Sequence, residues 1–174
     1  GGPAPGVEVR LLGPLGQPVA SGEVGEICVR APNVATRYWP DKPALDTEGF
    51  FHSGDLAQQA DDGSFTVVGR AKDMIISGGE NIYPAEIENL IATHPAVAEC
   101  GVVGVPDAER GQIVKAVVVL REGHAPSAAL ARELQDFVKQ SIAPYKYPRA
   151  VEFVEALPRT ETGKLQRFRL RQST

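Results

Sequence analysis

Residues 69–79 read GRAKDMIISGG, and this stretch decides the fold because the character of the chain changes within it. Before Arg70, short apolar runs are separated by Gly and Pro, which is typical of β-strands joined by turns. After Asp73, apolar runs of strand type alternate with helical periodicity. Domain boundaries normally lie where few contacts cross, so we place one between Arg70 and Asp73.

The first part reads as β structure without a helix. Four runs have the composition of short strands, and the sequence DDG at residues 61–63 is a typical hairpin turn. The four predicted strands are residues 7–12, 25–30, 50–56 and 65–69.

The second part reads as mixed α and β. Pro84 suits a first helical turn, and the apolar residues that follow it recur at helical spacing. A second helix is expected between a Ser127 cap and Pro144, and a short last one at residues 168–172. Three β-branched or apolar runs predict strands at residues 97–105, 113–120 and 150–156.

Composition excludes several classes of protein. With 43% hydrophobic residues the 174-residue chain can form a packed core, and no apolar run approaches the roughly 18 residues that span a bilayer. Cys28 and Cys100 lie in apolar runs without a Cys-x-x-Cys pair, so we expect buried, reduced thiols and a cytoplasmic protein. The three histidines show no ligand spacing, and we expect no metal site.

The net charge of −4 is unevenly distributed. Residues 139–174 carry eight Lys/Arg and three Asp/Glu, so the tail is basic on an acidic body. A basic segment can serve nucleic acid, a membrane surface or a phosphate-rich small molecule, or it can be a solvated face. Nucleic-acid binding is a weak hypothesis, because aromatic interleaving and a recognised motif are lacking.

Three motifs together carry a specific resemblance: HSGD at residues 52–55, the run at 69–88, and PRTETGK at 158–164. They closely resemble the AMP-forming adenylating enzymes, the superfamily of acyl-CoA synthetases, luciferases and peptide-synthetase adenylation domains. The phosphate-binding loop of that family, which works with Mg²⁺, and its acyl pocket lie upstream of these motifs. We therefore expect the carboxy-terminal piece of a larger ligase.

The resemblance implies an α+β fold in two parts. Residues 1–71 would be the β-rich end of the large amino-terminal domain. Residues 72–174 would be a mobile carboxy-terminal domain with a mostly antiparallel sheet flanked by helices, and Lys72 would be the hinge.

The resemblance also implies roles for three residues that in isolation would be a turn Asp, a surface Arg and a solvated Lys. Asp55 would bind the ribose, since a carboxylate can accept hydrogen bonds from both vicinal hydroxyls. Arg70 would reach the ribose and a nearby phosphate with its fork of donors. Lys164 would be catalytic, contacting the carboxylate oxygen and the α-phosphate during adenylation.

A further set of residues is implied for coenzyme A. Gly78 and Gly79 would line the pantetheine tunnel after the small domain has rotated about its hinge, because glycines leave room along exposed backbone. Lys146 would meet the phosphates of coenzyme A, with Arg110 and Arg149 as weaker candidates.

The leading hypothesis is thus an acid:CoA ligase that uses ATP, coenzyme A and a carboxylic acid, and whose small domain works against its own amino-terminal domain. ENIYP at residues 80–84 resembles the form common in fatty-acyl and aryl-CoA ligases. The alternative is an independent nucleotide- or CoA-binding or interaction module. The only methionine is Met74, which favours a truncated or processed chain over a native start at Gly1.

Overall fold

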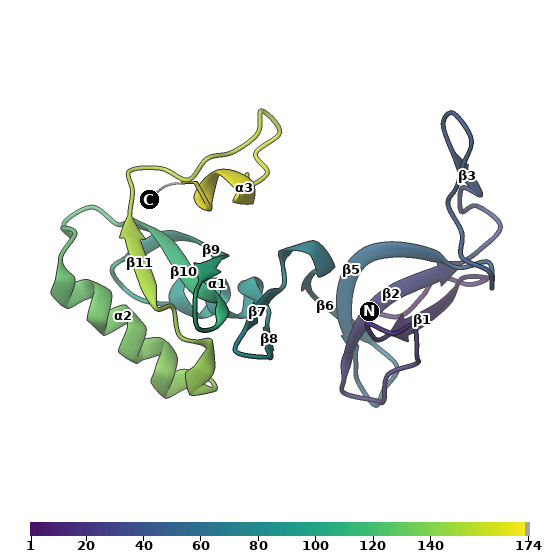
Figure 1. The fold of residues 1–174 in the computed structure, drawn as a ribbon, viewed down its shortest axis with the longest axis horizontal. Coiled ribbons are helices and arrows are strands. Elements are labelled where there is room, and N and C mark those ends of the chain that lie inside the picture. Colours follow the sequence, from purple (N-terminus) through teal and green to yellow (C-terminus); the bar gives the residue numbers. More distant parts are fainter. Residues whose placement is uncertain (173–174) are drawn as a thin grey trace. The chain divides into compact units, whose positions relative to one another are not determined.

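A computed structural model describes residues 1–172 (Figure 1). The chain divides into two compact units, Gly1–Lys72 and the residues from Asp73 on. Unit 1 and unit 2 each have a sheet and a core of their own. The fold class is α+β with mostly antiparallel sheets, as the sequence predicts.

Unit 1 is built on a four-stranded antiparallel sheet of order β1-β2-β5-β6. Each predicted strand is present. β5 continues to Gln59 because its ladder with β6 runs on toward the turn at residues 61–63, and β6 continues to Arg70, which pairs with Asp55. The strands are β1 (Glu8–Leu12), β2 (Val24–Arg30), β5 (Phe51–Gln59) and β6 (Phe65–Arg70). The sequence did not indicate a small hairpin of β3 (Arg37–Tyr38) and β4 (Lys42–Pro43).

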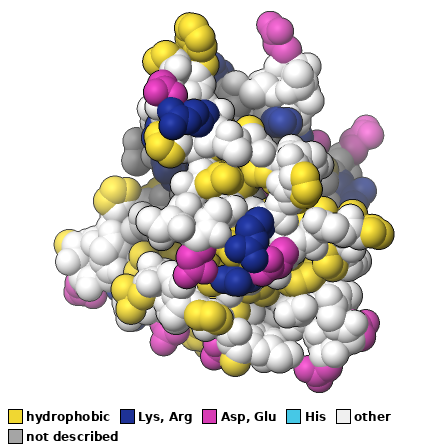
Figure 2. All heavy atoms as spheres, turned by 90° about the vertical axis from the view of Figure 1, so that its right-hand side faces the viewer, with side chains coloured by type: hydrophobic (Ala, Val, Ile, Leu, Met, Phe, Trp, Pro, Cys, Tyr) yellow, Lys and Arg dark blue, Asp and Glu magenta, His cyan; other side chains and the backbone are white. Residues whose placement is uncertain are grey.

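A small core holds unit 1 together, and charged groups cover part of it. Phe50 is buried, and the guanidinium groups of Arg10 and Arg30 lie 4.3 and 4.5 Å from its ring centroid. Both arginines are in turn paired with Glu8. Figure 2 shows basic side chains flanked by acidic ones on the face that it presents, so that face does not carry a patch of a single charge.

Unit 2 is organised around a three-stranded sheet of order β11-β10-β9. The long strands β9 (Val97–Asp107) and β10 (Gly111–Leu120) are antiparallel, and β11 (Ala150–Phe153) pairs with β10 in parallel. A hairpin of β7 (Ile75–Ser77) and β8 (Glu80–Ile82) precedes the sheet, after a 3₁₀ turn η1 (Ala71–Asp73).

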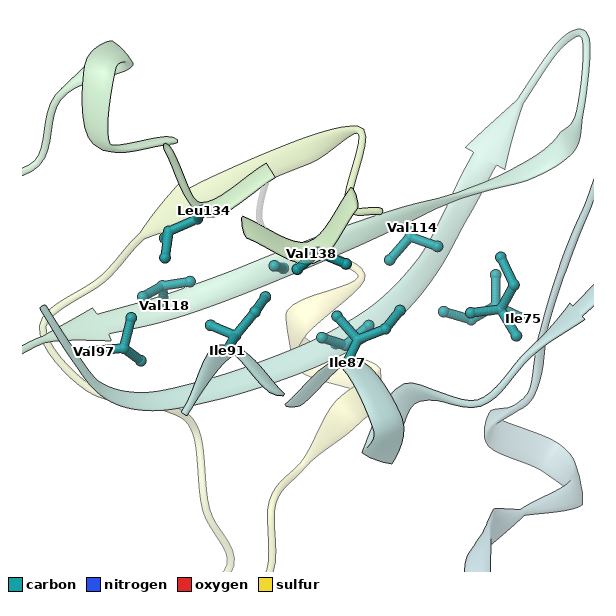
Figure 3. Close-up of a cluster of buried hydrophobic side chains, with 11 residues drawn as sticks. Ile75, Ile87, Ile91, Val97, Val114, Val118, Leu134 and Val138 are labelled. Atoms are coloured by element: carbon teal, nitrogen blue, oxygen red, sulfur yellow. The ribbon is translucent and has the colours of Figure 1, made fainter. Parts of the chain in front are cut away.

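Two helices cover one face of this sheet. They are α1 (Pro84–Ile91), with Pro84 in its first turn, and α2 (Ala128–Ser141), whose Ser127 cap accepts a hydrogen bond from the amide of Leu130. Figure 3 shows their apolar side chains, among them Ile87 and Leu134, gathered against valines of β9 and β10. β-Branched residues dominate because they pack well on a pleated surface.

The last segment of the chain covers the other face of the sheet. After a 3₁₀ turn η2 (Pro144–Lys146) and β11, residues 154–170 run back over the sheet and end in the short helix α3 (Arg167–Leu170). Leu157 and Leu170 are buried there against Val103 and Val117. We call residues 157–170 the C-terminal strap. No helix among residues 1–172 is long and apolar enough to cross a membrane.

Candidate functional site

The HSGD motif forms a bulge in β5. In the register of β2 and β5, Cys28 pairs with His52 and Glu26 pairs with Leu56, so three residues of β5 lie opposite Ile27 alone. Gly54 in this bulge has φ +72°, a conformation that costs an L-residue free energy but not glycine. The motif therefore interrupts the pairing of β2 with β5, and its extra residues point in directions that a regular strand would not allow.

Side chains satisfy the backbone groups that the bulge leaves unpaired. The Ser53 hydroxyl donates to the carbonyl of Ile27 (2.7 Å) and accepts from the amide of Asp55 (3.0 Å). The amide of Gly54 donates to Oε1 of Glu26 (2.9 Å). The bulge is thus held at two points, by Ser53 and Glu26.

Asp55 and Arg70, the two predicted nucleotide ligands, are brought together by the pairing of β5 with β6. They are register partners, and Nε of Arg70 lies 2.7 Å from Oδ1 of Asp55. The Asp55 side chain is 33% exposed and that of Arg70 is 55% exposed. One carboxylate oxygen and the two outer guanidinium nitrogens therefore stay available for a ligand that carries hydroxyl and phosphate groups.

A cluster behind the bulge includes residues that the sequence did not single out. His52 Nδ1 lies 2.9 Å from Oε2 of Glu26, and Nε2 lies 3.2 Å from Oδ2 of Asp46. Cys28 Sγ is 3.5 Å from the same Nδ1. The hydrogen bond with Glu26 is the largest cause that raises the pKa of His52, and burial, then Glu26, raises the pKa of the Cys28 thiol to about 11.

This cluster is relevant to the expectation of no metal site. Ligand atoms of Glu26, Cys28 and His52 all lie within 4.8 Å of one another, although the histidines show no ligand spacing in the sequence. Both oxygens of Glu26 and both ring nitrogens of His52 already have protein partners. The contacts therefore form a hydrogen-bonded network without needing an ion.

In unit 2, Gly78 and Gly79 form the two-residue turn between β7 and β8. Their φ values are +59° and +87°, as a type I′ hairpin turn requires at both central positions. The Gly78 amide donates to the carbonyl of Arg110 (3.0 Å), and a Cβ on Gly78 would lie 3.2 Å from Nη1 of Arg110. Arg110 is exposed, so the turn lies beside a cationic side chain.

Lys164 lies on an ordered turn of the C-terminal strap. Two hydrogen bonds join Thr160 and Lys164: the Thr160 amide donates to the carbonyl of Lys164 (2.9 Å), and the Lys164 amide donates to the Thr160 hydroxyl (3.1 Å). Arg159 binds the carbonyl of Gly163 (2.8 Å) and Glu99 (2.9 Å). The exposed Lys164 ammonium makes no ion pair within residues 1–172, so a defined turn presents an unpaired cation.

A partly buried ionic network ties the strap to the body of unit 2. Arg167 binds both oxygens of Glu88 and donates to the carbonyl of Val102 (2.9 Å), whose amide donates to Glu88 (2.7 Å). Asp73 lies 3.6 Å from Nε of Arg167. The hydrogen bond to Glu88 raises the pKa of Arg167, so the guanidinium of Arg167 stays charged.

The two remaining predicted lysines differ in environment. Lys72 lies in η1 and is exposed. The Lys146 ammonium contacts both oxygens of Glu86 at 2.7 and 2.8 Å, and its side chain is only 17% exposed. Phosphate binding by Lys146 would therefore compete with an existing ion pair. Asp55, Arg70 and Lys72 belong to unit 1, and the other predicted site residues belong to unit 2.

Comparison with known families gives two matches. Residues 86–164 match the model of the AMP-binding enzyme C-terminal domain, and residues 1–39 match the model of the AMP-binding enzyme. The first match covers unit 2 from the first turn of α1 to Lys164, and the second covers the first strands of unit 1.

Individual proteins support the same relationship. A feruloyl-CoA synthase from Amycolatopsis sp is 49% identical over 167 residues, which are 94% of this chain and 33% of that protein. An ATP-bound RpMatB-BxBclM chimera superimposes with a TM-score of 0.91 at 42% identity, over 99% of this chain and 35% of the other. The anthranilate CoA ligase AuaEII with anthranoyl-AMP gives 0.87 and 38%, over 99% and 34%. The chain therefore spans about a third of the length of the proteins that it resembles.

Proposed function

This chain belongs to the AMP-binding enzyme family, and from that membership we propose that it is the carboxy-terminal part of an AMP-forming acid:CoA ligase. The reaction would join a carboxylic acid to ATP as acyl-AMP and then transfer the acyl group to the thiol of coenzyme A. Relatives named as CoA synthases and ligases, and a neighbour that holds anthranoyl-AMP, support this reaction.

The observation that carries the proposal is the pair of Asp55 and Arg70. Their contact of 2.7 Å joins two neighbouring strands, and both side chains keep exposed polar atoms. We assign to the Asp55 carboxylate the role of accepting hydrogen bonds from the ribose hydroxyls. Arg70 would hold Asp55 in place through Nε and offer its outer nitrogens to the ribose or a phosphate.

Lys164 is proposed as the catalytic residue of the adenylation step. Its ammonium would lie between the attacking carboxylate and the α-phosphate and stabilise the charge that develops there. The ordered turn from Thr160 to Lys164 supports this role, because electrostatic stabilisation depends on preorganised groups. Losing one such contact typically lowers the rate by about 10²–10³.

For the second half-reaction we propose that unit 2 rotates about Lys72 and presents Gly78 and Gly79 to the pantetheine arm. The open space at a Cβ of Gly79 and the exposed guanidinium of Arg110 beside Gly78 support this assignment. Lys146 would contribute to phosphate binding only after leaving Glu86. A cytoplasmic location is proposed as well, and the two free cysteines agree with it.

The test uses the full-length protein and separates the two half-reactions. ATP–pyrophosphate exchange is measured with a panel of aryl and fatty acids, and thioester formation is measured from supplied acyl-AMP. Lys164→Ala should slow exchange by about 10²–10³ and largely spare thioester formation. Lys42→Ala is the matched control, since Lys42 is an exposed lysine in the β3–β4 hairpin.

Each outcome is informative. Lysine-dependent exchange with one class of acid would establish the ligase and identify its substrates. Equal loss of both half-reactions would contradict the rotation. Binding of ATP without exchange for any acid would contradict the ligase and favour an independent nucleotide-binding module.

A further inference from the structure

The network behind Asp55 connects groups that are distant in the sequence. The Asp46 carboxylate accepts the amides of Phe50 (2.8 Å) and Glu48 (2.9 Å) and faces Nε2 of His52 (3.2 Å). The other ring nitrogen of His52 faces Glu26 (2.9 Å), and Glu26 accepts the Gly54 amide (2.9 Å). A continuous series of contacts thus runs from the loop before β5 to the residue before Asp55.

The contact to Gly54 is the one that bears on Asp55. The Gly54 amide lies in the bulge and has no partner in the ladder of β2, so Glu26 is its acceptor. Gly54 has a left-handed backbone with φ +72° and no side chain that could pack and fix it. The direction in which the chain enters Asp55 therefore depends on the carboxylate of Glu26 together with the hydroxyl of Ser53.

We propose that Glu26 and His52 are positioning residues for the nucleotide: Glu26 holds the bulge that presents Asp55, and His52 holds Glu26. This inference rests on the proposed role of Asp55 in ribose binding. Neither residue needs to touch the nucleotide, because each acts through the backbone of Gly54. A displacement of about 1 Å of a group that binds or orients a substrate can cost about 100-fold in rate, so a residue that fixes the position of Asp55 can matter as much as a direct contact.

The network has a built-in dependence on pH, since a protonated imidazole donates from both nitrogens and a neutral one from only one. The groups that face or surround His52 are Glu26 and Cys28 of β2, Asp46 of the preceding loop, and Arg10 and Glu48, which line the same hollow. When the carboxylates of Glu26 and Asp46 are both ionised, protonated His52 donates a hydrogen bond to each of them. When His52 loses a proton, one of the two carboxylates loses its hydrogen-bond donor.

The sign of the effect follows from this. The hydrogen bond to Glu26, and then the contact with Asp46, raise the pKa of His52 above its ordinary value. Protonated His52, which donates to both carboxylates, therefore persists below this raised pKa and is lost as the pH rises through it. The KM for ATP should accordingly be low on the acid side and should rise above the His52 pKa. The KM for the carboxylic acid should not follow this profile.

The experiment measures KM for ATP, KM for the acid and kcat of the full-length protein between pH 5.5 and pH 9. Glu26→Ala removes the acceptor of Gly54 and should raise the KM for ATP about tenfold or more, with the KM for the acid within about twofold. Glu26→Gln keeps an acceptor oxygen and should restore the KM for ATP at alkaline pH. Both Glu26→Gln and His52→Gln should abolish the pH inflection.

Controls separate this inference from the proposed function and from simple loss of structure. Glu155→Ala removes an exposed glutamate of unit 2 and should change neither KM. Asp55→Asn should raise the KM for ATP. If Asp55→Asn raises the KM for ATP and Glu26→Ala leaves it unchanged, the positioning role of Glu26 is wrong and the ribose-binding role of Asp55 stands. If Asp55→Asn leaves the KM for ATP unchanged, both are wrong.

Two further outcomes would overturn the inference. A fall in kcat with both KM values unchanged would indicate that Glu26 serves stability alone. A rise in the KM for ATP after dialysis against EDTA and return to Mg²⁺, reversed by zinc, would make Glu26, Cys28 and His52 a metal centre instead. An unchanged KM after EDTA, together with rescue by Glu26→Gln, supports positioning by hydrogen bonds.

Discussion

At the scale of single residues, the candidate site depends on glycine conformation and on cross-strand partners. Gly54 permits the bulge, and Ser53 and Glu26 satisfy the backbone around it. The motif HSGD was recognisable in the sequence, so Asp55 could be predicted. Glu26 could not, because it lies 28 residues away and only the register of β2 with β5 brings it to Gly54.

Gly54→Ala tests whether the bulge matters beyond its conformational strain. The new methyl group meets no atom, so the cost is the left-handed backbone alone, about 1 kcal/mol of unfolding free energy. Gly63→Ala is the matched control, because Gly63 has φ +81° and equally open space in the turn between β5 and β6. Denaturant unfolding of the chain should show similar losses for both variants.

The two variants should differ in function. Only Gly54→Ala should raise the KM for ATP of the full-length protein, because only Gly54 precedes Asp55. An equal KM for ATP in both variants would show that Asp55 tolerates a distorted bulge.

At the scale of elements, the C-terminal strap is held by apolar packing and by ionic contacts, which include Arg159 with Glu99 and Arg167 with Glu88. Gly101 of β9 leaves the space that Leu170, Leu165 and Leu157 occupy on the sheet. Arg167 joins α3 to α1 and β9 through Glu88 and Val102. Since Lys164 lies between these anchors, its position depends on both.

Gly101→Ala should displace the strap. The added Cβ would lie 2.7 Å from Cδ1 of Leu170 and 3.3 Å from Cδ2 of Leu165, so buried side chains must shift. We expect a loss of about 1–3 kcal/mol in unfolding free energy, measured by denaturant titration, and slower adenylation by the full-length protein. Gly2→Ala is the control, because its Cβ meets nothing within 4 Å. Unchanged stability would mean that the leucines repack freely.

Arg167→Ala should destabilise unit 2 more strongly. It leaves the carboxylate of Glu88, which is 15% exposed, without its cation, and breaking such a buried pair typically costs about 3 kcal/mol. Arg169→Ala removes a neighbouring exposed arginine of α3 and should cost little. Thermal and denaturant unfolding followed by circular dichroism would compare them. Similar losses for both arginines would refute the special role of the Glu88 network.

At the scale of the whole molecule, the chain divides into two compact units between Lys72 and Asp73, at the predicted hinge. Lys72 ends unit 1, and Asp73, the first residue of unit 2, lies against Arg167 of the strap. The assignment of these units as the end of a large domain and a rotating small domain stays a prediction. It is consistent with a chain that spans about a third of its relatives, 33% of the feruloyl-CoA synthase.

Lys72→Pro tests rotation directly. Proline restricts φ to about −65°, so a hinge that must adopt two conformations at this residue would lose one of them. In the full-length protein, adenylation and thioester formation from acyl-AMP should respond unequally to Lys72→Pro. Lys72→Ala keeps the backbone free and should leave both rates near the wild-type values. An equal response of the two half-reactions to proline would place the hinge elsewhere.

Asp55, Arg70 and Lys164 were singled out by the resemblance of their motifs to a known family, and their roles stay predictions. The sequence by itself determined the α+β class and most of the strands and helices, because these follow from patterns that are local along the chain. It did not indicate the β3–β4 hairpin, whose strands are only two residues long and leave no period to detect. Only the tertiary structure decided which groups meet: Asp55 with Arg70, Lys146 with Glu86, and Glu26 with Gly54 and His52. The physical reason is that hydrogen bonds and ion pairs depend on strand register and helix packing, which bring together residues that are far apart in the chain.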